Sequence, residues 1–139
     1  MNIAERKYKV PLAELLDRLC VDQIKEVLLS EGKSSYASEM EILQHDIDLI
    51  VLEHNIPLTA RLLRIVITLS QLNLHIWLLK DRMQRESDKY DELLKLAHQL
   101  NGIRNRMKNL LLEESGDKEK SAQRSNIGLD GLTGWDVSV

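Results

Sequence analysis

Two groups of polar side chains stand within otherwise apolar segments of this chain, at spacings that place each group on one side of a helix. Asn73, Trp77 and Asp81 follow one another at intervals of four residues. Residues three and four positions apart lie on the same face of an α-helix. The same rule applies further along the chain to Asn101, Arg104, Asn105 and Lys108. We therefore expect one polar stripe on each of two helices.

The two stripes are expected to meet at one height. Their helices are joined near Ser87, and residues equally far from the turn of an antiparallel hairpin lie side by side. Asn73 precedes Ser87 by 14 positions (87 − 73), and Asn101 follows it by 14 (101 − 87). A buried amide without a partner costs about 1–3 kcal/mol, so this polar patch needs internal partners. Asp17, beside apolar residues of an earlier helix, is the expected carboxylate for Arg104.

The polar patch has two interpretations. In the first, which we prefer, its hydrogen bonds fix the register of the helices, as single buried asparagines do in coiled coils. In the second, the patch binds a polar or anionic small ligand, such as a phosphate or a sugar. The candidate ligand-binding residues are then Asp17, Asn73, Trp77, Asp81, Asn101, Arg104, Asn105 and Lys108.

Other groups of reactive residues do not form a recognisable catalytic or metal site. Glu41, His45 and Asp48 share one helical face, but di-iron bundles need Glu-x-x-His pairs on two helices, so we interpret this face as a solvated surface. The chain contains no P-loop, Gly-x-Ser-x-Gly or dinucleotide-binding motif. The single cysteine, Cys20, is expected to be a buried, unreactive thiol. We expect no catalytic residue, metal or cofactor. The sequence favours a protein that is not an enzyme, without excluding one.

Hydrophobic periodicity indicates the helices that would carry these residues. Pro11 and Pro57 suit first helical turns because their missing N–H would have no partner there. Gly32 would end the first helix, and Ser38 and Ser87 would cap the second and fourth. The predicted helices cover residues 11–30, 38–54, 58–86 and 88–114. Short connections between them favour an all-α, antiparallel four-helix bundle with long third and fourth helices.

The composition changes after Ser115. Residues 115–139 are polar, contain glycine and serine, and show no periodicity. We therefore divide the chain into a helical bundle at residues 1–114 and a flexible polar tail at residues 115–139. Four apolar side chains would alternatively dock the tail onto the bundle or onto a protein partner: Leu129, Leu132, Trp135 and Val137.

The composition of the whole chain limits the classes of protein to which it can belong. Its 139 residues suit one domain, and the net charge of −3 leaves no electrostatic footprint for nucleic acid. The opening residues lack the apolar segment of a signal peptide. The longest uncharged run, residues 65–79, is too short to span a membrane. We expect a cytoplasmic protein without membrane insertion.

Three segments together resemble a family of uncharacterised bacterial helical proteins. The segments here are "PLAELLDRLCVDQIKEVLL", "LNLHIWLLKDRMQRE" and "LAHQLNGIRNRMK". The family carries a Glu-Leu-Ile-Asp-Lys/Arg-Leu opening, then Asn-x-x-Leu-Trp-x-x-Glu-Asp, then Asn-Asp-x-Arg-x-x-x-Lys. The matching positions are Glu14, Asp17, Arg18, Asn73, Trp77, Asp81, Asn101, Arg104 and Lys108.

The resemblance covers roughly residues 10–110. It implies a gene neighbourhood but no particular enzymatic activity. Members of the family are often encoded near glycosyltransferase and cell-surface polysaccharide genes. Two acidic positions of the family pattern are Lys80 and Gly102 in this chain. Any metal or proton chemistry that those acids perform in the family is therefore in doubt here.

These observations predict a non-catalytic cytoplasmic binding or assembly protein. The protruding hairpin of the third and fourth helices would self-associate, most simply as a homodimer, and the tail is a possible site for a protein partner. The alternative is a small enzyme or ligand-binding accessory in surface-glycan metabolism, which would use the polar patch.

Overall fold

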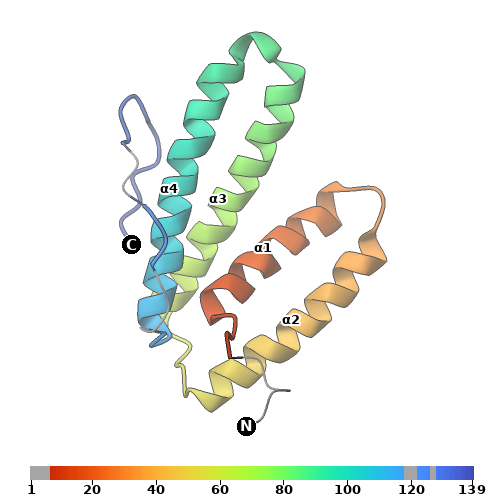
Figure 1. Cartoon of the computed structure of the whole chain (residues 1–139), viewed down its shortest axis with the longest axis vertical. Coiled ribbons are helices and arrows are strands. Elements are labelled where there is room, and N and C mark those ends of the chain that lie inside the picture. Colours follow the sequence, from red (N-terminus) through yellow and green to blue (C-terminus); the bar gives the residue numbers. More distant parts are fainter. Residues whose placement is uncertain (1–6, 118–121, 126–127) are drawn as a thin grey trace.

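Two helical hairpins make up the fold (Figure 1). The structure is a computed structural model that describes residues 7–117, 122–125 and 128–139, and within these ranges it contains no β-strand. The elements are α1 (Leu12–Leu28), α2 (Lys33–Glu53), α3 (Ala60–Arg85), the short 3-10 helix η1 (Ser87–Lys89) and α4 (Tyr90–Glu114). The predicted all-α four-helix architecture, with long third and fourth helices, is confirmed.

α1 holds the two hairpins together. It packs against α2, α3 and α4, whereas α2 makes helix-to-helix contacts with α1 alone. The innermost part of the core therefore lies where α1 crosses the α3–α4 hairpin, and its fully buried aliphatic side chains are Leu12, Ile65, Leu69, Leu72, Leu100, Met107 and Leu111. The end of the α3–α4 hairpin that carries η1 extends beyond the other two helices (Figure 1).

The start of α2 differs from the prediction. Ser38 was expected to cap this helix, but α2 begins five residues earlier, at Lys33. The cause is Gly32, whose φ of 77° lies in the left-handed region, which glycine adopts without the steric penalty of a Cβ atom. Gly32 thus precedes α2 instead of ending α1, and its carbonyl accepts a hydrogen bond from the Tyr36 N–H at 3.1 Å.

α3 begins with a side-chain cap that positions the long hairpin. The Oγ1 atom of Thr59 accepts a hydrogen bond from the Leu62 N–H at 3.1 Å, which satisfies one of the donors left free at a helix start. Among the described residues, α3 alone has the length and apolar composition of a membrane-crossing helix, with a mean hydropathy of 1.5 in its most apolar window. In that window 33 % of the residues are buried inside the structure, and Ile65, Leu69 and Leu72 of α3 are fully buried.

The described part of the tail lies against α3 and α4. The Trp135 ring meets the His75 ring edge-on at a centroid distance of 4.9 Å. The Gln99 side-chain amide donates to the carbonyls of Gly128 at 3.2 Å and Asp130 at 3.0 Å. The half-buried tail residues that pack on the core are Leu132, Trp135, Val137 and Val139. These contacts match the docking alternative, because side chains of α3 and α4 supply specific partners for the described part of the tail.

Trp135→Ala should lower the free energy of unfolding by about 1–2 kcal/mol, because a half-buried aromatic ring loses its contact with the helices. Urea unfolding followed by circular dichroism measures the loss. Leu129→Ala is the matched control, since Leu129 is 50 % exposed, and should change stability by less than about 0.5 kcal/mol. Equal stability of the Trp135 variant and the wild type would show that the tail does not pack on the bundle.

Candidate functional site

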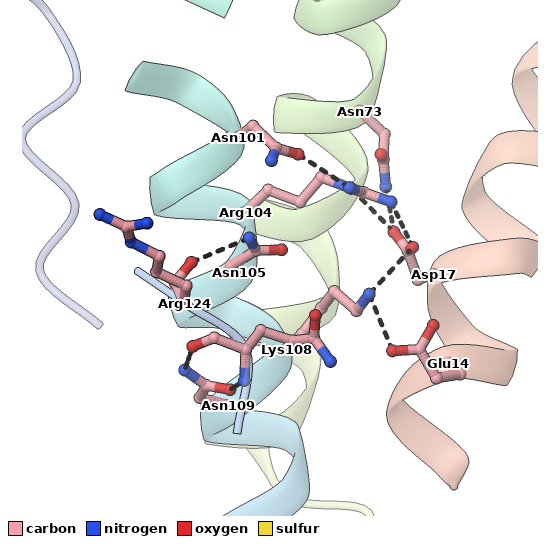
Figure 2. Close-up of polar contacts among 10 residues, drawn as sticks. Glu14, Asp17, Asn73, Asn101, Arg104, Asn105, Lys108, Asn109 and Arg124 are labelled. Atoms are coloured by element: carbon pink, nitrogen blue, oxygen red, sulfur yellow. Dashed lines mark hydrogen bonds and ion pairs between the residues drawn. The ribbon is translucent and has the colours of Figure 1, made fainter. Parts of the chain in front are cut away.

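Asp17 of α1 is the centre of a polar cluster between the two hairpins (Figure 2). Its side chain is only 8 % exposed. One carboxylate oxygen, Oδ1, accepts hydrogen bonds from Asn73 Nδ2 at 2.8 Å and from Arg104 Nε at 3.2 Å. The other oxygen, Oδ2, accepts from Arg104 Nη2. Arg104 therefore binds the carboxylate through two nitrogen atoms, which is the strongest geometry for this type of pair.

Three further side chains complete the cluster. Arg104 Nη1 donates to Asn101 Oδ1 at 2.9 Å. Lys108 Nζ lies 2.8 Å from Glu14 Oε1 and 3.7 Å from Asp17 Oδ2. We refer to these six residues as the Asp17 cluster: Glu14, Asp17, Asn73, Asn101, Arg104 and Lys108.

Helical spacing on three elements builds the Asp17 cluster. Glu14 and Asp17 are three residues apart on α1, so both carboxylates point toward the α3–α4 hairpin (Figure 2). The predicted hairpin register is also observed, because Asn73 and Asn101 bind the two members of the same ion pair, Asp17 and Arg104. The Asn73 side chain is thus buried between helices, and Asn101 is half-buried beside Arg104.

The charges of the Asp17 cluster balance one another. Each of its two cations faces a carboxylate, and the Lys108 and Asp17 side chains are both 8 % exposed. A buried charge without a partner costs several kcal/mol, so removing one member of such a pair is strongly destabilising. A charged ligand would therefore have to break an existing ion pair to bind here. The arrangement is suited to joining helices and offers no uncompensated charge to an anion.

Three of the predicted site residues lie outside the cluster. Asp81 is 57 % exposed and pairs with Arg85 at 3.1 Å on its own helix. Asn105 donates to the carbonyl of Arg124 at 2.9 Å. Trp77 is half-buried and has no part in the polar contacts of the cluster described above. Each step of four residues turns about 40° around an α-helix, so the stripe that begins at Asn73 rotates away from Asp17.

The residue spacing did not predict two further residues, one in the Asp17 cluster and one that binds the tail. Glu14 was matched only through the family resemblance, and the structure shows that it pairs with Lys108. Asn109 forms two hydrogen bonds with the backbone of Gln123, one as donor at 2.9 Å and one as acceptor at 2.7 Å. Asn109 follows Asn105 by four residues, so an extension of the α4 stripe by one turn would have included it.

A cavity of about 650 Å³ borders the cluster at Glu14 and Lys108. Its polar lining also includes Arg18 and Glu39, which pair with each other at 2.7 Å. These four charged side chains thus form ion pairs with one another. Within the described residues, no group of three His, Cys, Asp or Glu side chains is placed to hold a metal ion.

The buried cysteine has the chemistry expected of it. Burial, together with the nearby Asp17 carboxylate, raises the pKa of the Cys20 thiol to about 11. A thiol with this pKa is almost entirely protonated at neutral pH and is a poor nucleophile. The predicted burial of Cys20 is confirmed.

A second buried carboxyl group lies between α1 and α2. Asp22 is 1 % exposed, and its Oδ2 atom has no hydrogen-bond partner within the described part of the chain. Burial raises the pKa of Asp22, and the neighbouring Glu39 carboxyl raises it further. The pKa of Glu39 is lowered, chiefly by its hydrogen bond from Arg18. We therefore expect the α1–α2 contact to weaken as the pH rises through the pKa of Asp22.

Comparisons of the chain with protein-family models, with curated proteins and with solved structures gave no match.

Arg104→Ala should destabilise the protein by about 3–5 kcal/mol, because it leaves the buried Asp17 carboxylate without its cation. Urea unfolding at pH 7 measures the difference. Arg85→Ala is the matched control, because Arg85 also pairs with an aspartate but is 66 % exposed, and it should cost less than about 1 kcal/mol. Equal, small effects of both variants, with loss of a phosphate-induced rise in Tm for the Arg104 variant alone, would instead support the ligand-binding interpretation.

Asp22→Asn should become increasingly stabilising relative to the wild type as the pH rises from about 3 to 7. A carboxyl group whose pKa is raised on folding contributes stability below its unfolded pKa, about 3.9 for aspartate, and loses it as the pH passes the folded pKa. The asparagine variant lacks this loss. Urea unfolding of both proteins across this pH range measures the difference, and a constant difference would contradict the raised pKa.

Proposed function

We propose that the protein is a non-catalytic cytoplasmic assembly or binding protein that self-associates through its α3–α4 hairpin. The observation that carries this proposal is an apolar surface on α3 that the described part of the chain leaves exposed. Four aliphatic side chains on this helix are between 37 % and 57 % exposed, and we call them the apolar stripe: Leu63, Ile67, Leu74 and Leu78.

The apolar stripe occupies a different face of α3 from Asn73, the α3 member of the Asp17 cluster. At about 100° per residue, its four members fall within an arc of about 60° on α3. Asn73, which binds Asp17 of α1, projects from one flank of this arc. Arg64 and His75, which contact tail residues Ser138 and Trp135, project from the other. α1 and the tail therefore border the stripe on its two sides.

The size of the apolar stripe supports an interaction function. Its side chains expose on the order of 300 Å² of apolar surface, which is in the range of patches that mark interaction sites on soluble proteins. The cluster around Asp17, by contrast, already satisfies its own charges. A binding role for the stripe thus requires no disruption of the fold, whereas a ligand at Asp17 would have to displace an ion pair.

The proposal predicts that the full chain forms dimers in a concentration-dependent way. Sedimentation velocity between about 1 and 200 μM, a range that spans typical dissociation constants of modest interfaces, measures the average mass. We expect it to rise from the 16.0 kDa of one chain toward twice that value. A mass of one chain at every concentration would contradict self-association.

A further inference from the structure

The apolar stripe has a symmetric arrangement along α3. Leu63 lies as far before the midpoint between positions 70 and 71 as Leu78 lies after it, and Ile67 and Leu74 are placed in the same way. In two antiparallel helices related by a two-fold axis, residues at equal distances on either side of the axis face each other. Leu63 of one copy would then contact Leu78 of the other, and Ile67 would contact Leu74.

The charges along α3 also permit this pairing. Between Leu63 and Leu78, the only residue with a permanent charge is Arg64. The Arg64 guanidinium donates to Ser138 Oγ of the tail at 2.9 Å, so it is held at the flank and not in the centre of the stripe. Two copies can thus approach without placing like charges opposite each other, which would otherwise oppose the contact.

The contact area is sufficient for a modest dimer. The stripe of each copy, with the side chains that border it, would remove on the order of 1,000 Å² from water in total, which is at the lower limit for specific interfaces. Trp77 lies at the edge of the stripe on the side of Asn73 and is half-buried. Its remaining surface would be covered by the partner helix. In this position Trp77 would contribute to the dimer contact, whereas it takes no part in the Asp17 cluster.

From this symmetry we infer that the partner of the apolar stripe is a second copy of this chain, bound with its α3 antiparallel and with the two-fold axis between positions 70 and 71. The inference rests on the proposed self-association and specifies its surface and direction. Each copy uses the same four side chains, so the contact closes as a dimer and does not continue into a filament.

Ile67→Glu tests the surface. The substitution would place an unpaired carboxylate against Leu74 of the other copy, and it should raise the dimer dissociation constant by at least about 100-fold. Ile42→Glu is the matched control, because Ile42 of α2 is 65 % exposed, comparable to the 57 % of Ile67. The control should dimerise as the wild type does. Circular dichroism should show equal helicity in all three proteins, because both positions are exposed.

Cysteine cross-linking tests the direction. A cysteine introduced at Gln71 lies next to the proposed axis and should join two copies under mild oxidation or with a short bismaleimide. A cysteine at Leu78 should not join to its own counterpart, because the two positions would be about 22 Å apart along the helices. The wild-type chain provides the background, since Cys20 is buried.

These experiments distinguish a failure of the antiparallel α3 interface from a failure of self-association itself. Dimerisation of the wild type that Ile67→Glu does not weaken would overturn the inference and leave self-association standing. Cross-linking at Leu78 but not at Gln71 would overturn the antiparallel direction. A monomeric wild type would overturn both. Binding of the monomer to phosphatidylglycerol vesicles, lost in Ile67→Glu, would assign the stripe to a lipid surface and also overturn the inference.

Discussion

The bidentate contact between Arg104 and the buried Asp17 carboxylate is the interaction on which the assembly of the two hairpins depends. α1 is the only helix that packs on all the others, and Asp17, together with the Glu14–Lys108 pair, links it to the α3–α4 hairpin through polar contacts. α2 reaches the rest of the molecule through α1. Loss of the Asp17 contact would therefore weaken more than one ion pair, because the position of the whole α1–α2 hairpin relies on it.

The same contact explains how polar residues are tolerated in an apolar helix. Asn73 on α3 is buried, yet its amide donates to Asp17. On α4, Asn101 accepts a hydrogen bond from Arg104, which lies three residues further along the same helix. The penalty of burying each group is offset by a partner at a defined height, so the network permits one helix register and disfavours others. With Asn73 paired in this way, the exposed aliphatic face of α3 is the surface that this helix can offer to another molecule.

Much of the fold and part of the candidate site followed from the sequence. Hydrophobic periodicity located the helices, although Pro11 and Pro57 precede the first turns of α1 and α3 and do not lie within them. Counting from Ser87 placed Asn73 and Asn101 at one height. The prediction also assumed that residues at intervals of four stay on one straight line along the helix. Each such step rotates about 40° around the helix, so Trp77 and Asp81 point away from Asp17. The cap at Ser38 was misplaced because the conformation of Gly32 depends on its backbone surroundings. The docking of Trp135 required knowledge of the surface that receives it, which composition cannot provide.

A double-mutant cycle tests most directly whether Asp17 and Arg104 act as one structural unit. The free energies of unfolding of Asp17→Asn, Arg104→Gln and the double variant would be compared with that of the wild type. If the pair joins the hairpins, the double variant should be less destabilised than the sum of the single variants by about 2 kcal/mol or more. Additivity within about 0.5 kcal/mol would contradict this account.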